Sequence, residues 1–280
     1  LHLCDRRQRQ MCIRDSNKFG KLVIAQLPVD IKKVIKNYPR TFRVGLQGPD
    51  ILFFYKAFSK NKINQLGVYY HHHDVFPFME NASSVVKQYG TDSAEYSYIL
   101  GFICHFVLDN ACHPYINESM KSTGCGHVEI EGDLENLMLN KDEFVPELYP
   151  INMLIPADVK TAHSIAHFFE SLDDETILDS LKWMKRIKKI FVAPGVFKRT
   201  AIDLMMRATL HYKRLKGHVV EPEANPKCRA KSEHIYRLMV EAVREAAQLI
   251  ENFNAALEGS KLSDKFHRDF NGSHFENFYK

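Results

Sequence analysis

The stretch Gly101-Phe-Ile-Cys-His105-Phe-Val-Leu-Asp109-Asn-Ala-Cys-His113-Pro114 sets three side chains of metal-binding type among apolar residues. Positions four apart lie one turn above each other on a helix, so His105 and Asp109 should point the same way. Pro114 disfavours the α conformation at the residue before it. We therefore predict a helix over residues 92–112 that ends near His113, with His113 turned toward a second ion.

A buried helix with two hydrogen-bonded histidines and a cap-like Asp is the competing interpretation, since such spacings also occur by chance. Burial favours the metal. A carboxylate and two imidazoles inside an apolar helix need partners, because an unpaired buried charge is very costly. One divalent cation would satisfy all three. The apolar neighbours that make this helix hydrophobic nearly all round are Tyr98, Ile99, Leu100, Phe102, Ile103, Phe106, Val107 and Leu108.

The rest of the chain follows the same helical period. It has 280 residues, 45% of them hydrophobic and 26% charged, which suits one large soluble domain or two small ones. Runs that alternate apolar and polar residues, as β-strands do, are nearly absent. The sequence contains no run of about 18 apolar residues, so we predict no transmembrane helix. We predict an all-α, single-domain multi-helix bundle with a metal cluster in its core. The predicted helices cover residues 28–36, 51–58, 63–70, 76–89, 92–112, 126–140, 156–172, 174–192, 195–214, 231–257 and 262–270.

The beginning of the chain differs from the rest. Residues 1–16 have no period and no signal-peptide pattern, and Met11-Cys-Ile-Arg-Asp-Ser16 resembles a translated sequencing adapter. We predict that residues 1–16 are not native and that residues 17–280 form the domain. Residues 1–16 hold four Arg and two Asp, so the remainder has 34 basic and 32 acidic residues, a net charge of +2. This near balance argues against a nucleic-acid binder.

Four cysteines lie outside this segment: Cys104, Cys112, Cys125 and Cys228. Cys104 and Cys112 are two helical turns apart, about 12 Å of rise, which is too far for a disulfide between them. With no visible export signal, we expect free thiols and a cytoplasmic protein. A signal peptide lost with the native N-terminus would instead indicate secretion.

Potential metal ligands gather in one part of the chain. Residues 71–127 contain six of the fourteen His: His71, His72, His73, His105, His113 and His127. The candidate carboxylates are Asp50, Asp109 and Glu131. His127-Val-Glu-Ile-Glu131 repeats the spacing of His105 and Asp109, and two such helices can share a metal cluster. Mixed imidazole and carboxylate ligands favour zinc, and several carboxylates favour a catalytic over a structural site.

Not every member of this set needs to bind a metal. Asp50 follows Gly48-Pro49, where it could simply cap a helix. Three consecutive residues point three ways on a helix, so at most one or two of residues 71–73 can serve one site. His163 and His167 also have metal spacing but lie outside the dense region, and we expect a structural or surface role. Residues 182–189 form a basic amphipathic stretch, which indicates a solvated helix face or contact with a membrane surface.

Taken in order, Gly48-Pro49-Asp50, His71, His105-x3-Asp109, His113-Pro114 and His127-x3-Glu131 resemble the zinc-dependent phospholipase C family. That family shares its all-helical fold with the zinc nucleases that cut single-stranded nucleic acid. The matching motifs cover roughly residues 17 to 140, and their order is far more specific than any one of them.

The resemblance implies roles for these residues. Asp50, His71, His105 and Asp109 would hold one zinc, with Asp109 bridging to another, and His113, His127 and Glu131 would hold a further zinc. His72 and His73 stay open as substitutes for His71. In the family, a His shortly before a Phe-Gly helps to bind the remaining zinc. Here Phe19-Gly20 matches, but Ser16 stands at the His position, so we expect two zinc ions, and a third if the native protein has His there.

The implied function is hydrolysis of a phosphodiester, with water activated by the zinc cluster and Asp50 as ligand and general base. The expected substrate is a phospholipid or another phosphodiester. One alternative is a zinc nuclease, for which Phe53, Phe54, Tyr55, Tyr69 and Tyr70 could stack bases, although the near-neutral charge argues against it. A second alternative is a metal-binding structural or interaction protein without turnover.

Overall fold

A computed structural model describes residues 13–193, 195–208, 212, 216–219 and 221–275. These residues form an all-α bundle without a β-strand; an isolated bridge between Arg268 and His274 is the sole β-type pairing among them. The α-helices are α1 (Ile13–Gln26), α2 (Val29–Asn37), α3 (Pro39–Gly45), α4 (Lys62–His72), α5 (Phe76–Tyr89), α6 (Ala94–Thr123), α7 (His127–Lys141), α8 (Val159–Ala166), α9 (Asp174–Phe191), α10 (Val196–Arg207) and α12 (Arg229–Leu257). The short 3-10 helices are η2 (Gly48–Phe54), η3 (Pro146–Leu148), η4 (Ile151–Leu154), η5 (Lys216–His218) and η6 (Asp264–Phe266).

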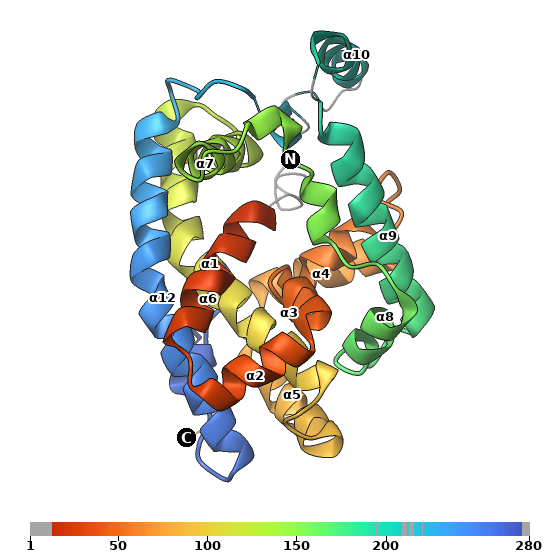
Figure 1. Ribbon diagram of the computed structural model, residues 1–280, viewed down its shortest axis with the longest axis vertical. Helices are drawn as coiled ribbons and strands as arrows, with labels where there is room; N and C mark the ends of the chain where they lie inside the picture. The colour runs from red at the N-terminus through yellow and green to blue at the C-terminus, as the bar shows by residue number, and fades with distance from the viewer. Residues whose placement is uncertain (1–12, 194, 209–211, 213–215, 220, 276–280) are drawn as a thin grey trace.

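Helix α6 is the central element of the bundle. It begins after Ser93, whose hydroxyl accepts a hydrogen bond from the Tyr96 amide, and it ends at Gly124 in the left-handed conformation. Its first half is apolar on every side, so it must be covered all round. Helices α1, α2, α3, α5, α7, α8 and α12 all contact it. Figure 1 shows α12 running alongside α6 on the left, while α8 and α9 form the right-hand side.

The crossing of α3 and α6 depends on two glycines. A Cβ on Gly45 would lie 2.1 Å from the Tyr98 carbonyl oxygen, and one on Gly101 would lie 2.3 Å from the Phe42 carbonyl oxygen. Both distances are far too short for non-bonded atoms, so the two backbones meet only because neither residue has a side chain. This close approach places η2, which carries Gly48 and Asp50, against α6.

The prediction that the central helix ends near His113 was wrong, because α6 continues through Pro114 to Thr123. A proline inside a helix removes one hydrogen bond and costs about 3 kcal/mol. Burial of Ile116 and Ser119 in the next turns favours continuation. Asn110 also donates a hydrogen bond to the Asp269 carbonyl oxygen, which fixes the C-terminal segment against this part of the helix. Tertiary packing therefore outweighs the local effect of Pro114.

Other predicted elements differ in extent. Residues 51–58 form no α-helix; η2 covers Gly48–Phe54, and the positive φ of 44° at Lys56 interrupts any continuation. The prediction over 262–270 was also wrong in extent, since the helical part is η6. Helices α1 and α3 were not predicted, and α8 covers only the middle of residues 156–172. The last predicted residues of 195–214 lie mostly outside the described part of the chain.

Helix α1 begins at Ile13, before the predicted domain start at residue 17. Ile13, Arg14, Asp15 and Ser16 are all buried in it. These four residues therefore pack within the helical domain. The origin of residues 1–16 stays a prediction, and residues 1–12 lie outside the described residues.

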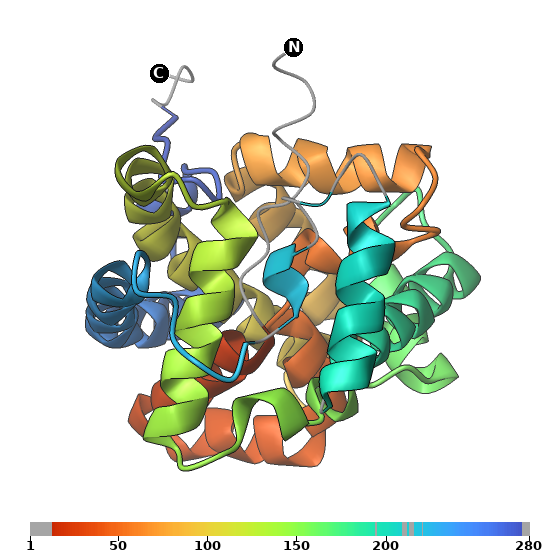
Figure 2. The same cartoon turned by 90° about the horizontal axis from the view of Figure 1, so that it is seen from above.

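Seen from above in Figure 2, α7 and α12 lie on one side of the molecule and α9 on the other.

Candidate metal centre

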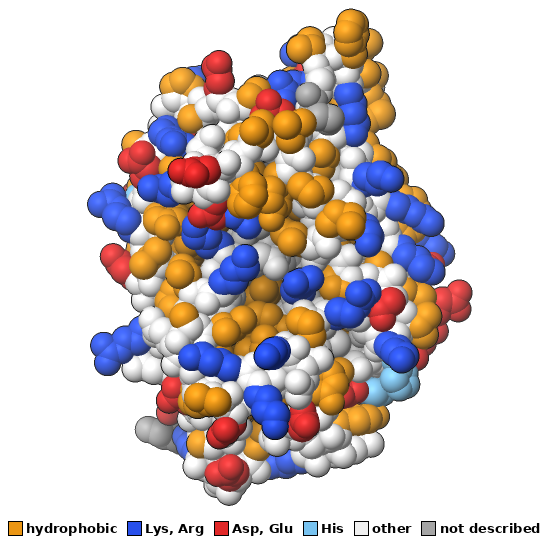
Figure 3. All heavy atoms as spheres, viewed as in Figure 1, with side chains coloured by type: hydrophobic (Ala, Val, Ile, Leu, Met, Phe, Trp, Pro, Cys, Tyr) orange, Lys and Arg blue, Asp and Glu red, His pale blue; other side chains and the backbone are white. Residues whose placement is uncertain are grey.

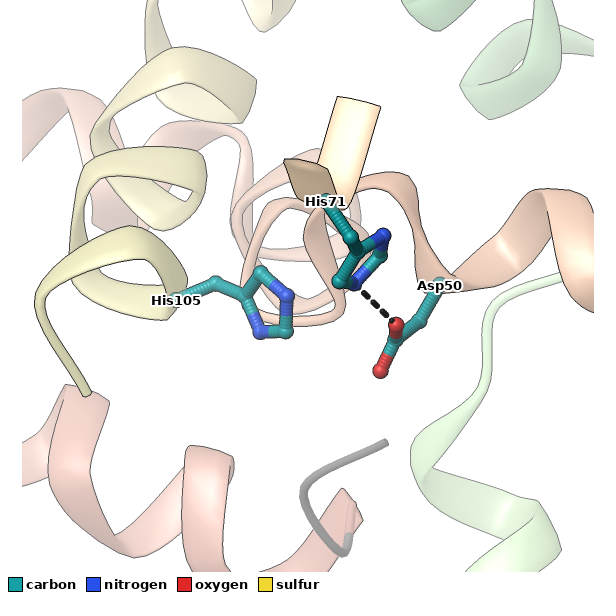
Figure 4. Close-up of side chains that lie close together, drawn as sticks. All are labelled: Asp50, His71 and His105. Atoms are coloured by element: carbon teal, nitrogen blue, oxygen red, sulfur yellow. Dashed lines mark ion pairs between the residues drawn. The ribbon is translucent and has the colours of Figure 1, made fainter. Parts of the chain in front are cut away.

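Three elements bring a first group of donors together. Asp50 comes from η2, His71 from the last turn of α4 and His105 from the middle of α6. One donor atom from each lies within 4.8 Å of the others. His71 Nε2 forms an ion pair with Asp50 Oδ1 at 2.9 Å, and Figure 4 shows the His105 ring facing the same space. All three side chains are buried.

The backbone orients His71. Its Nδ1 lies 2.7 Å from the Gly67 carbonyl oxygen, one turn earlier on α4. A ring that donates from Nδ1 presents Nε2 as the nitrogen available to a metal, which is the usual outer arrangement of a zinc-binding histidine. Asn271 donates a hydrogen bond to the His71 carbonyl oxygen at 2.8 Å and fixes the end of α4. His71 is thus held in the orientation that a ligand needs.

Gly48 makes room for His105. It has a φ of +47°, in the left-handed region that favours glycine. A Cβ at this position would lie 2.0 Å from His105 Cδ2, so any other residue would displace the ring. The glycine before Pro49-Asp50 therefore serves the site twice, since it allows the turn that delivers Asp50 and the space that His105 fills.

A second group consists of His113 on α6 with His127 and Glu131 on α7. Their donor atoms also lie within 4.8 Å of one another, and all three residues are buried. His127 Nε2 lies 2.9 Å from Glu131 Oε1, one helical turn away. His113 Nδ1 lies 2.9 Å from the Phe270 carbonyl oxygen, which again leaves Nε2 as the nitrogen available to a metal.

Asp109 lies between the two groups. Its Oδ2 is 3.5 Å from His105 Nε2 and 3.6 Å from His113 Nδ1. The side chain is fully buried, and neither carboxylate oxygen accepts a hydrogen bond within the described residues. A buried carboxylate without hydrogen bonds is strongly unfavourable unless a cation neutralises it. This position suits a carboxylate that bridges two metal ions.

The electrostatics of the centre are those that a bound cation would compensate. Burial raises the pKa of Asp109 well above its ordinary value, and the charges of Asp50 and Glu131 raise it further. Burial likewise raises the pKa of Glu131 and of Asp50, against the opposing effects of His127 and His71. Burial lowers the pKa of His105 well below its ordinary value. A divalent cation would reverse these shifts, because it favours ionised carboxylates and neutral imidazoles.

The donor set fits zinc. Two imidazoles with a carboxylate, repeated in a second group and linked by Asp109, match the nitrogen and oxygen ligands that zinc takes in catalytic sites. Ligands about 2.0–2.2 Å from a tetrahedral zinc are roughly 3.4 Å apart, so donor atoms within 4.8 Å need only a small closure around the ion. All seven residues predicted from the sequence therefore lie in these two groups or between them.

The weaker candidates lie elsewhere. His72 contacts Asn271, and the exposed His73 stacks on Tyr69, so of the three consecutive histidines only His71 belongs to a donor group among the described residues. His163 is exposed and pairs with Asp174 at 2.7 Å. His167 pairs with Glu95 at 3.2 Å. His163 is therefore a surface residue, and His167 has a structural partner.

The sequence interpretation missed two buried carboxylates beside the second group. Asp15, one residue before Ser16, is fully buried on α1. Its pKa is raised well above the ordinary value by burial and then by the charges of Glu135 and Glu131. Glu135 stands four residues after Glu131 on α7, a spacing that could have indicated it. Helix α1 thus delivers a carboxylate next to the position where we expected His in the native chain.

It also missed the C-terminal segment. The Phe270 ring centroid lies 5.0 Å from that of His71 and 5.4 Å from that of His105. Its carbonyl oxygen holds His113, as described above. No local pattern marks a phenylalanine 157 residues after His113 in the sequence as part of the site. Only the fold brings it there.

Comparison with known proteins gives the same assignment as this geometry. The sequence model of one family, described as zinc dependent phospholipase C, matches residues 18–190 and so covers more than half of the chain. The chain belongs to the zinc-dependent phospholipase C family. Searches of curated proteins and of solved structures found no match. The matched residues include both candidate donor groups and Asp109. The family match and these groups together support a metal-dependent hydrolase of the phospholipase type.

Proposed function

We propose that this protein hydrolyses the phosphodiester of a phospholipid between glycerol and head group, with zinc held at the two donor groups. The observation that carries the proposal is the Asp109 carboxylate, which is buried, accepts no hydrogen bond within the described residues and lies between His105 and His113. A structural bundle gains nothing from such a residue. A pair of adjacent metal ions, by contrast, uses it as a shared ligand.

The protein's own residues would divide the chemistry as follows. Zinc, when bound, polarises the phosphodiester and lowers the pKa of a water molecule. Asp50, His71 and His105 would hold one ion, His113, His127 and Glu131 the other, and Asp109 would fix their separation. Asp50 would also accept the proton of the attacking water, as the carboxylate that pairs with His71 beside this ion. Hydrogen bonds from His71 to Gly67 and from His113 to Phe270 hold the rings in place.

The assay that tests this proposal compares substrates and metal states. The protein should release a phosphorylated head group from phospholipid in mixed micelles, lose that activity with a chelator and recover it with zinc. Cleavage of single-stranded DNA in place of lipid would favour the nuclease alternative. Bound zinc with neither reaction would favour a binding protein without turnover. His163→Ala is the matched control, because His163 lies on the surface outside both donor groups.

Contact with a membrane surface is the second part of the proposal. Within the described residues no helix is long and apolar enough to cross a bilayer. Helix α10 and the end of α9 nonetheless expose several large apolar side chains: Ile190, Val196, Phe197, Leu204 and Met205. Phe197 is the most exposed of these five residues, at 94%. In Figure 3 apolar side chains gather at the top, over α10, and basic side chains follow the right-hand edge, over α9.

The charge of this region suits an anionic lipid surface. Residues 182–207 contain eight Lys and Arg but a single acidic residue, Asp203. A helix that presents apolar side chains next to basic ones can lie in the interface of a bilayer, with the apolar side toward the acyl chains. We infer that α9 and α10 together make the transient contact that brings the centre to its lipid substrate.

Vesicle co-sedimentation tests the contact separately from catalysis. Phe197→Ser combined with Leu204→Ser should weaken binding to vesicles of mixed anionic and zwitterionic lipid by about tenfold or more, since each side chain loses its burial in lipid. Hydrolysis of a soluble short-chain phospholipid should stay unchanged. Val29→Ser, a comparably exposed apolar residue on α2, serves as control. Equal vesicle binding by the double variant would refute the role of α10 and leave the proposed hydrolysis standing.

A further inference from the structure

Two of the four described cysteines touch each other. Cys125, between α6 and α7, and Cys228, directly before α12, have their Sγ atoms 2.8 Å apart, although 103 positions separate them in the sequence. Both are thiols in this structure, and both are buried. The sulfurs of a disulfide are about 2.05 Å apart. The two thiols thus need to approach by less than 1 Å to reach bonding distance.

The surrounding backbone holds the two cysteines at this separation from both sides. The Cys125 amide donates to Thr123 Oγ1, and the Cys228 amide donates to the Asn225 carbonyl oxygen. Asn225 in turn binds α7, because its side chain donates to Glu129 and its amide donates to Asp133. The facing thiols therefore belong to a fixed junction between the starts of α7 and α12.

The Ser232 hydroxyl closes this junction. It lies one turn into α12, is fully buried and donates to Asp133 Oδ2 at 2.7 Å. Asp133 thus accepts hydrogen bonds from both Asn225 and Ser232, and it links α7 to the segment before and after Cys228. These backbone and side-chain hydrogen bonds leave the two cysteines little freedom to separate. A disulfide between them can therefore form without distorting the fold.

We propose that Cys125 and Cys228 form a disulfide when the protein meets a disulfide oxidant, and that this bond ties the start of the metal-binding helix α7 to α12. Cys104 and Cys112 provide the contrast. Both are fully buried on α6, where about 12 Å of helical rise separates them, and neither contacts another cysteine within the described residues. Among the four described thiols, Cys125 and Cys228 are the pair found in contact.

The reaction is an ordinary thiol–disulfide exchange. The Cys125 thiol loses its proton, and the thiolate attacks one sulfur of glutathione disulfide and expels one glutathione thiolate. The Cys228 thiolate then attacks Cys125 Sγ in the mixed disulfide and expels the second glutathione. The protein loses two electrons and two protons, and glutathione disulfide becomes two glutathione thiols. Burial raises the pKa of Cys228, so the exchange should be slow in the folded protein and faster during folding.

The bond would act on the metal centre through one short connection. Cys125 lies two residues before His127, and Gly124 and Gly126 flank it. A disulfide at this point would limit how far the first turn of α7 can move from α12. It would therefore resist the local opening that separates His127 and Glu131 from His113.

Peptide mapping of the complete chain tests the proposal. Samples are incubated with a glutathione redox buffer, both folded and during refolding, then alkylated and digested without reduction. We expect a mass lower by two hydrogen atoms and a cross-linked peptide that joins Cys125 and Cys228. Thermal unfolding should shift upward by roughly 5–10 °C on oxidation, as expected for a bond that closes a loop of about 100 residues.

Two variants make the outcome decisive. Cys228→Ala should abolish the cross-link and the thermal shift, whereas Cys112→Ala should retain both. The proposal is overturned if Cys125 and Cys228 remain alkylatable after both incubations. It is also overturned if either of them is found paired with a different cysteine. Because the readouts are mass and unfolding temperature, neither result depends on hydrolytic activity.

Discussion

Among single residues, Asp109 carries a large electrostatic cost in the absence of a cation. Its carboxylate has no exposure, no hydrogen bond within the described residues and two further carboxylates nearby that raise its pKa. The residue is tolerable where a cation is bound and unfavourable otherwise. Its position one turn after His105 and one turn before His113 is fixed by the helix alone.

Replacing Asp109 tests its effect on the metal-bound and on the metal-free protein. Asp109→Asn keeps the shape of the side chain but removes its charge, so we expect the zinc content of the purified protein to fall and hydrolysis to disappear. The metal-free variant should unfold at a higher temperature than metal-free wild type, because a buried charge is gone. Elemental analysis and thermal unfolding with chelator measure both effects. Normal zinc content in the variant would contradict the assignment of Asp109.

A second residue-scale prediction concerns Gly48. Gly48→Ala forces a Cβ into the position of the His105 ring, in addition to the strain of its positive φ. We expect loss of zinc together with a clear loss of stability. Gly90→Ala is the matched control, because Gly90 also has a positive φ, of 86°, but nothing lies within 4 Å of its Cβ position. The control should cost about 1 kcal/mol and keep its zinc. Equal zinc content in both variants would show that His105 does not depend on Gly48.

At the scale of elements, the C-terminal segment after α12 holds the second donor group together. Arg268 Nη1 donates to Asn110 Oδ1 at 2.7 Å, and Arg268 Nη2 donates to Glu245 Oε1 at 2.8 Å. These bonds fix the segment that carries the Phe270 carbonyl oxygen, to which His113 is bound. A segment far from the motifs thus positions a ligand of α6.

The Glu245 pair makes this anchoring depend on pH. Burial opposes ionisation, but the hydrogen bonds and charges of Arg268 and Lys265 outweigh it and hold the pKa of Glu245 below its ordinary value. A lowered folded-state pKa stabilises the fold above the unfolded-state pKa, and the gain disappears as pH falls through the folded-state pKa.

Glu245→Gln should therefore lower the free energy of unfolding by about 1 kcal/mol at pH 7. The difference from wild type should begin to shrink below the ordinary glutamate pKa of about 4.5 and vanish as pH falls through the lower folded-state pKa. Denaturant unfolding measured from pH 3 to pH 7 gives both quantities. Glu251→Gln on the exposed side of α12 serves as control and should show no such trend. A difference that stays constant across this range would exclude an ionic origin.

At the scale of the whole molecule, the metal centre connects distant parts of the bundle. Its donors come from η2, α4, α6 and α7, and the residues that orient them come from the C-terminal segment as well. Ions that bind all of these elements at once stabilise the folded state and not the unfolded chain, so binding energy becomes folding energy.

Metal removal should therefore destabilise the entire fold. At a hundredfold excess over its dissociation constant, one bound ion contributes about 2.7 kcal/mol, so chelation should lower the unfolding temperature by roughly 5–10 °C. Calorimetry with chelator, followed by zinc addition, measures the loss and its recovery. Unfolding that is insensitive to chelator would mean that the bundle is stable without metal and would weaken the case for zinc at both groups.

The sequence predicts the long helices better than it predicts their connections. The periodic apolar pattern predicted α5, α6, α7, α9 and α12 to within a few residues at most of their ends, and the i, i+4 spacing of His105 with Asp109 and of His127 with Glu131 predicted which donors share a face. The C-terminal end of α6 was wrong because packing of Ile116 and Ser119 outweighs the local effect of Pro114. Helix α3 escaped prediction because its seven residues are too short for a period to appear.

By itself the sequence determined the all-α class and the central helix. It also determined that His105 and Asp109, and likewise His127 and Glu131, share a helix face, because a helix fixes the relative direction of residues four apart without help from the rest of the chain. The tertiary structure alone decided that His71 rather than His72 or His73 faces Asp50, that Phe270 holds His113, and that Cys125 meets Cys228. The physical reason is the sequence separation of the residues in contact. Contacts between distant segments depend on how helices pack, and packing is governed by the summed shape and burial of many side chains, which no local spacing encodes.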